Sequence, residues 1–148
     1  MSRRNARENA FKLLFSTIAR QEAPLPQELF DEAGDEEVIS GKHISEEGKS
    51  YIQSVYDGVL KHIKDLDECI SMYLKNWQID RINRVCLASL RLCFYEIQYM
   101  DDIPFRVSAS ETVEIVKKYA GEEEAKFVNG VLGEYIRREI EPKETKQD

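Results

Sequence analysis

The chain has 148 residues, with 21 basic and 28 acidic side chains and a formal net charge of −7. That length suits one domain or two very small ones, and the acidic balance excludes a protein that binds nucleic acid over its whole surface. No apolar run approaches the length of a membrane span, and the chain begins with charge where a secretory signal would be apolar. Because none of the three cysteines forms a closely spaced pair, we expect a soluble cytoplasmic protein with reduced thiols.

Charge is distributed unevenly along the chain. Residues 1–20 hold five basic side chains against one acid, Glu8, whereas residues 21–50 hold nine acids against two lysines. A basic end on an acidic body indicates a local surface that binds anions.

Apolar residues at helical spacing predict a first helix over about residues 3–20. Arg3, Arg4 and Arg7 fall in its first two turns, where the helix macrodipole favours acids. Three arginines there cost stability unless an anion offsets their charge, which favours a polyanionic ligand. Residues 24–33 predict a short helix, and the acidic stretch around 34–44 predicts a solvated loop.

The middle of the chain predicts three more helices. Ser45 is expected to cap a long helix. A shorter one, with apolar positions from Leu66 to Trp77, follows it. Asp80 is expected to cap the next, which runs to about Tyr99 and carries apolar residues around most of its circumference.

The last two helices follow a turn at residues 101–104. The sequence from Ser108 to Glu111 has the spacing of a capping box and is expected to open a helix that Gly121 ends. The final helix is expected to open with Glu122 and to stop at Pro142, which leaves a frayed tail over 141–148.

About seven helices with short connections, and no period-2 strand, predict an all-α helical bundle.

Catalysis needs an arranged nucleophile, base or metal. His62 and Cys69 can share a helix face, but a catalytic pair would also need a basic setting or a helix end to lower the thiol pKa. Cys86 and Cys93 suit core packing better than metal ligation, since metal sites use closer pairs. There is no glycine loop for phosphates. We therefore expect no enzymatic activity, no metal and no cofactor.

Three basic groups are candidates for nucleic-acid binding. They are the arginines Arg3, Arg4 and Arg7, the run Lys117-Lys118-Tyr119, and Lys126-Phe127. In the second and third groups an aromatic residue follows lysine, as in sites for single-stranded nucleic acid. By periodicity alone the two aromatics would be core residues, and the arginines a solvated helix end. Composition alone therefore predicts a soluble helical protein and leaves RNA binding as one hypothesis for its function.

Three blocks of sequence resemble the NusB family. Arg4-x-x-Arg7-Glu8-x-Ala10, followed by Leu14-Phe15, is similar to the family's opening motif. Leu90-Arg91-Leu92-x-x-Tyr95-Glu96, followed by Ile103-Pro104 and Val107, is similar to its central stretch. Lys126-Phe127-Val128-Asn129-Gly130-Val131-Leu132 is similar to its closing signature. The blocks stand in the family's order and span nearly the whole chain.

The resemblance implies two small three-helix bundles packed together as one RNA-binding domain over residues 1–148. It also implies a transcription antitermination factor that supports ribosomal RNA transcription. Such a protein binds a boxA-type single-stranded RNA together with a small-subunit ribosomal protein that doubles as an elongation factor. Its link to the antitermination complex of RNA polymerase is indirect.

The resemblance also implies roles for nine residues. Arg3, Arg4 and Arg7 would clamp RNA phosphates. The remaining six would stack on bases, accept from base amines or add phosphate contacts, and are Tyr119, Phe127, Glu123, Lys117, Lys118 and Lys126. The chain departs from the family at several positions that bear on partner contacts, among them Phe15, Cys86 and Ser110.

Two alternatives to the RNA-binding adaptor stay open at this point. One is a helical protein-interaction module or homodimer in which a partner's acids mask the basic end. The other is a fragment of an RNA-modifying enzyme, which we consider weaker because no cofactor-binding domain follows the helices.

Overall fold

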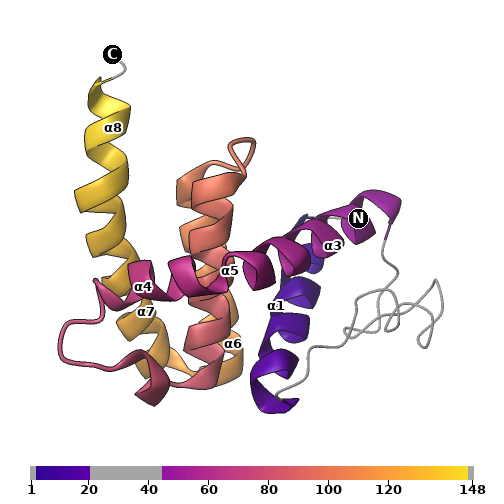
Figure 1. Cartoon of the computed structure of the whole chain (residues 1–148), viewed down its shortest axis with the longest axis horizontal. Helices are drawn as coiled ribbons and strands as arrows, with labels where there is room; N and C mark the ends of the chain where they lie inside the picture. Colours follow the sequence, from indigo (N-terminus) through magenta and orange to yellow (C-terminus); the bar gives the residue numbers. More distant parts are fainter. Residues whose placement is uncertain (1–2, 21–44, 147–148) are drawn as a thin grey trace.

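The computed structural model describes residues 3–20 and 45–146, and in these ranges every regular element is helical (Figure 1). The expected all-α class is therefore confirmed, while the short helix expected at 24–33 and the loop around 34–44 lie outside the described residues. In chain order the elements are α1 (Arg3–Arg20), α3 (Glu46–Lys61), α4 (Ile63–Ser71), the 3-10 turn η1 (Ile79–Arg81), α5 (Arg84–Tyr99), α6 (Phe105–Ala120), α7 (Glu122–Tyr135), the π-helical turn η2 (Ile136–Ile140) and α8 (Glu141–Lys146).

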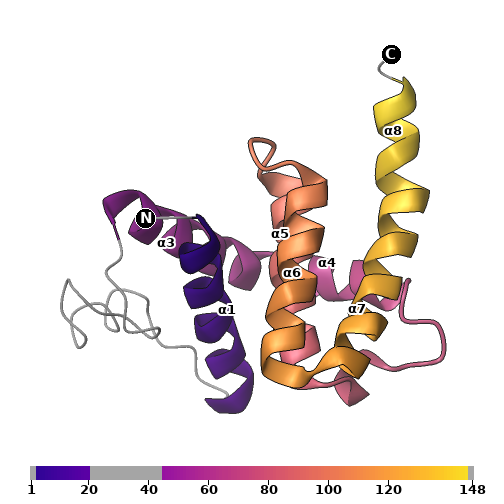
Figure 2. The same ribbon diagram turned by 180° about the vertical axis from the view of Figure 1, so that it is seen from behind.

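Helix α5 lies at the centre of two groups of helices. On one side it packs against α1 and α3, and on the other against α6 and α7 (Figures 1 and 2). Helix α1 presents Ala6, Ala10, Leu13 and Leu14 to this core, all at most 2% exposed. The two packed bundles implied by the family resemblance are thus visible in the described residues. Their contact brings the first turns of α1 beside α6.

Two helix starts test the expected capping residues. Ser45 caps α3 as expected, because its Oγ accepts a hydrogen bond from the N–H of Gly48 at 3.1 Å. Asp80 does not cap α5 and instead lies in η1. Asn83 takes that role, accepting from the N–H of Val85 at 2.7 Å, so α5 begins later than expected.

The expected capping box of α6 is wrong. The helix begins at Phe105, directly after Pro104, whose own backbone is extended. Ser108 is consequently inside the helix and buried, and Glu111 is available for a contact with another helix. Gly121 ends α6 as expected, with φ of 97°, a conformation that favours glycine.

Pro142 does not stop the C-terminal helix. Helix α7 passes through η2 into α8, which contains the proline and continues to Lys146. Proline lacks an N–H donor and interrupts the regular i to i−4 pattern, and a π-helical turn is a common form of such an interruption. Residues 141–146, expected as frayed, are therefore helical. None of the described helices has the length and apolar character needed to cross a membrane.

Candidate nucleic-acid interface

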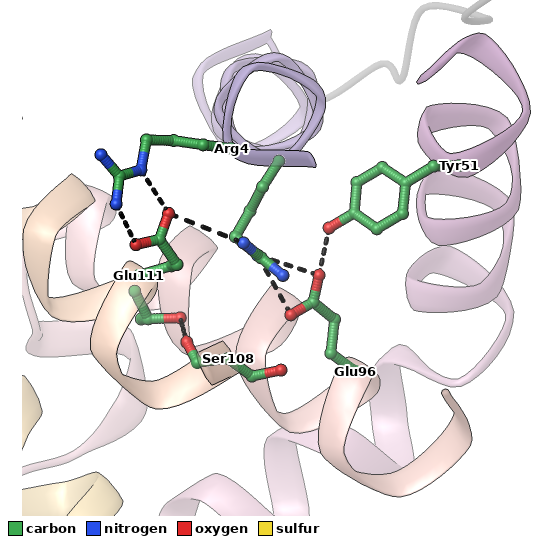
Figure 3. Close-up of polar contacts among 7 residues, drawn as sticks. Arg4, Tyr51, Glu96, Ser108 and Glu111 are labelled. Carbon is green, nitrogen blue, oxygen red and sulfur yellow. Dashed lines mark hydrogen bonds and ion pairs between the residues drawn. The ribbon is translucent and has the colours of Figure 1, made fainter. Parts of the chain in front are cut away.

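Arg7 lies inside the protein, where α1, α3 and α5 meet. Its side chain is 2% exposed, and its Nε donates to both carboxylate oxygens of the fully buried Glu96 at 3.1 Å. The hydroxyl of Tyr51 donates to the same carboxylate from α3, as Figure 3 shows. Burial alone would lower the pKa of Arg7, but the charge and hydrogen bond of Glu96, together with the charges of Tyr51 and Glu111, outweigh it and the pKa is raised. Arg7 is thus a charged residue of the core.

Arg4 lies on the same helix as Arg7 but points outward. Its guanidinium is 74% exposed and donates from Nε and Nη2 to Glu111 of α6, at 2.7 and 2.9 Å (Figure 3). The bond from Arg4 holds the pKa of Glu111 below its usual value. The same carboxylate lies 3.9 Å from Nη1 of Arg7. Protein carboxylates therefore offset two of the three arginines at the start of α1, Arg4 and Arg7, so these two do not by themselves require the polyanionic ligand that the sequence favours.

Arg3 is exposed and sits over the ring of Tyr51, with its guanidinium carbon 4.8 Å from the ring centroid. All three arginines contribute to an open groove of about 560 Å³ between α1 and α6. The lining of that groove also includes the apolar residues Ile103, Pro104 and Val107 and the acids Asp102 and Glu111. Its arginines and apolar surface together suit a ligand that carries both phosphates and bases.

Lys118 and Tyr119 meet α1 further along, at Glu8. The Lys118 ammonium lies 2.8 Å from Glu8, and the Tyr119 hydroxyl donates to the same carboxylate. The Tyr119 ring is 5.3 Å from the ring of Phe11 and is 37% exposed, so it is not the core residue that periodicity favours. Burial would raise the pKa of Glu8, but the two hydrogen bonds and the charges of Lys118 and Lys12 together outweigh it and the pKa is lowered.

Phe127, Lys126 and Glu123 form a third group, on α7. Phe127 is half-buried and meets the ring of Trp77 edge-on, with the centroids 6.3 Å apart, while Lys126 and Glu123 are exposed. Lys117 lies in the last turn of α6, and its ammonium is 3.7 Å from Glu122 in the first turn of α7.

The nine expected site residues thus lie in three places. Arg3, Arg4 and Arg7 line the groove between α1 and α6, and Lys118 and Tyr119 contact Glu8. The other four, Lys117, Glu123, Lys126 and Phe127, lie on the end of α6 and on α7. Among the nine, Arg7 alone is buried. Sequence reasoning missed the acids that engage the basic residues, Glu8, Glu96 and Glu111, and the exposed Trp77. Glu8 and Glu96 stand in the family motifs and Glu111 in the expected capping box, but no local pattern links any of them to its basic partner.

The cysteines considered for catalysis or metal binding all have a raised thiol pKa, which opposes formation of the reactive thiolate, and burial is the first cause at Cys69. Burial raises the pKa of the Cys93 thiol to about 12. The Cys86 thiol, whose pKa burial also raises, donates to Glu124 at 3.2 Å. His62 stacks on Tyr99 with ring centroids 4.5 Å apart. Within the described residues, no group of three or more histidine, cysteine or acidic side chains could hold a metal ion.

Comparison with known proteins identifies the family to which this chain belongs. The sequence profile of the NusB family matches residues 4–137. The chain belongs to the NusB family. A Clostridium botulinum (strain Hall) protein named transcription antitermination protein NusB is 39% identical over 143 residues, covering 92% of this chain and 100% of that protein. A protein of the same name from Listeria innocua is 41% identical over 132 residues, covering 89% and 94%.

Solved NusB structures have the same fold. T. maritima NusB superposes with a TM-score of 0.80 at 30% identity, over 93% of this chain and 92% of that one. A NusB chain from a structure of the antitermination factors NusB and NusE in complex with dsRNA gives 0.76 at 29% identity, over 91% and 96%. The family and fold implied by the three sequence blocks are therefore confirmed.

Proposed function

We propose that this chain is a transcription antitermination factor that binds boxA-type single-stranded RNA together with a small-subunit ribosomal protein. In that role it supports ribosomal RNA transcription and acts indirectly on RNA polymerase. Its NusB membership supports the proposal, as does the NusB relative solved with NusE and RNA. We assign it no enzymatic activity, a cytoplasmic location, and a single RNA-binding domain over residues 1–148.

One observation carries this proposal: an acidic protein concentrates exposed cations and an exposed aromatic where α1 and α6 meet. Arg3, Arg4 and Lys118 are exposed there, and Tyr119 stands beside them with its ring accessible. Arginine matches phosphate in a bidentate geometry, and aromatic rings stack on unpaired bases. A protein-interaction surface without RNA specificity would not need this combination.

Arg7 has a different role in this proposal. Since its side chain is buried against Glu96, we assign it to fixing α1 on α5, which positions Arg3 and Arg4, rather than to clamping a phosphate. Lys117, Lys126, Glu123 and Phe127 remain proposed RNA contacts on the neighbouring surface of α6 and α7.

The test is fluorescence anisotropy with a labelled boxA-type RNA and its scramble, with and without the ribosomal partner. We expect tighter binding to boxA-type RNA, strengthened by the partner. The double variant Arg3→Ala with Arg4→Ala should weaken binding. Arg137→Ala is the matched control, since it removes an exposed arginine that pairs with Glu134 at the far end of α7. Equal, weak binding to both RNAs would overturn the proposal in favour of a protein-interaction module or homodimer.

A further inference from the structure

Trp77 is the only tryptophan of the chain, and it is 59% exposed. Sequence periodicity places it on the apolar stripe of a helix, but α4 ends at Ser71 and Trp77 lies in the connection that follows (Figures 1 and 2). There its ring contacts Phe127 of α7. A large exposed aromatic side chain on an ordered segment commonly marks a binding surface.

The backbone around Trp77 is fixed. Tyr73 and Leu74 are buried, and Lys75 then adopts a left-handed conformation with φ of 56°. The N–H of Trp77 donates to the carbonyl of Leu74 at 3.2 Å. This turn directs the chain out of the core. The indole meets the Phe127 ring edge-on, with an interplanar angle of 72°, so the ring is held while most of it faces solvent.

Two hollows flank the Trp77–Phe127 pair. One, of about 240 Å³, has Arg81, Asn83 and the two acids Glu123 and Glu124 on its walls. The other, of about 300 Å³, has Lys126 and Asn76. Each hollow thus combines aromatic surface with a cation and an amide that can bond to a base edge, and the first also presents two carboxylates that can accept from base amines.

The charged surroundings of Arg81 and Lys126 differ from those of Arg4 and Lys118. Within the part of the chain that the structure describes, neither Arg81 nor Lys126 has a carboxylate at ion-pair distance, whereas Arg4 and Lys118 are paired with Glu111 and Glu8. A phosphate can therefore approach Arg81 or Lys126 without displacing a protein carboxylate. A protein-docking patch would instead have an apolar centre depleted of charge.

We infer that Trp77 is a base-stacking residue: one unpaired RNA base stacks on its indole beside Phe127, and Arg81 and Lys126 contact the phosphates on either side. This inference rests on the proposed RNA-binding function and extends the RNA path from α6 and α7 to the connection between α4 and α5. Free cations interleaved with aromatic rings are the usual composition of sites for single-stranded RNA.

The single tryptophan makes the inference directly testable in the unmodified protein. A labelled boxA-type RNA is titrated against the full chain while RNA anisotropy and Trp77 emission are recorded together, with and without the ribosomal partner. Stacking on the indole should quench the emission in parallel with the rise in anisotropy. Emission of a Trp77→Phe variant supplies the background.

Variants provide the second readout. Trp77→Leu keeps an apolar side chain but removes the stacking face, and we expect it to weaken RNA binding by about ten-fold. Trp77→Phe should recover part of that loss. Met72→Leu is the matched control, because Met72 is 66% exposed in the same connection and has no ring to stack; it should bind RNA as the unmodified chain does.

The outcomes separate this inference from the function on which it rests. RNA that binds without changing Trp77 emission, with Trp77→Leu binding equally well, overturns the stacking role and leaves the proposed function intact. Emission that changes with the ribosomal partner alone, and not with RNA, overturns it in favour of a protein-docking role. Absence of RNA binding under every condition contradicts the proposed function itself.

Discussion

The guanidinium of Arg4 donates two hydrogen bonds to the carboxylate of Glu111, at 2.7 and 2.9 Å, and joins the first turn of α1 to the middle of α6. The same carboxylate lies 3.9 Å from Arg7. In the free protein, Glu111 therefore offsets the positive charge of Arg4 and lies close to that of Arg7. An RNA phosphate that approaches the Nε and Nη2 edge of Arg4 competes with this acid.

Glu111→Gln should therefore bind boxA-type RNA more tightly. An exposed ion pair contributes at most about 1 kcal/mol, so the gain should be about two- to five-fold. Anisotropy at fixed salt measures it. Glu47→Gln, which removes a carboxylate from the exposed first turn of α3, controls for net charge. Weaker RNA binding by Glu111→Gln would mean that Glu111 orients Arg4 for the phosphate.

Arg7→Ala should lower the free energy of unfolding by about 3–5 kcal/mol, because it leaves the buried Glu96 carboxylate without its cation. Urea unfolding measures this loss. Arg4→Ala is the matched control and should cost no more than about 1 kcal/mol, since Arg4 is exposed. If Arg7→Ala proved as stable as the unmodified chain but lost RNA affinity, Arg7 would contact RNA directly.

Stability should depend on pH through Glu8. Although burial acts to raise its pKa, the hydrogen bonds from Lys118 and Tyr119 lower it below the ordinary value of 4.5. A carboxylate whose pKa is lowered by folding stabilises the protein above its unfolded pKa, and that contribution is lost as pH falls through the folded value. Lys118 affects stability at alkaline pH. Because folding raises its pKa, its contribution to the free energy of unfolding persists until pH rises above 10.5.

The comparison is between the unmodified chain and Glu8→Gln, by urea unfolding from about pH 7 to about pH 3. The unmodified chain should be the more stable at neutral pH, and the difference should shrink below about pH 5. A difference that stayed constant down to the lowest pH would show that packing, rather than the charge of Glu8, accounts for it.

Local signals predicted much of the fold. The apolar stripe of residues 3–20, the cap at Ser45 and the stop at Gly121 each depend on neighbours within one or two turns, and all three are confirmed. A helix start was predicted wrongly where two nearby residues could each cap the helix. Asp80 and Asn83 are both good caps, and the chain uses Asn83.

The site was harder to predict because its partners are distant in sequence. Arginines at a helix start do need anions, but Glu96 and Glu111 supply them from 89 and 107 residues away. No local pattern distinguishes these acids from a ligand. The exposure of Trp77 likewise follows from the end of α4 and the left-handed turn at Lys75, neither of which the apolar spacing reveals.

The salt dependence of boxA-type RNA binding tests most directly whether the start of α1 holds RNA phosphates. For single-stranded RNA, the slope of log affinity against log salt changes by about 0.7 for each phosphate contact. The slope of the double variant Arg3→Ala with Arg4→Ala should be shallower by about that amount for each arginine, whereas Arg137→Ala should leave it unchanged. An unchanged slope in the double variant would contradict the claim that the start of α1 holds RNA phosphates.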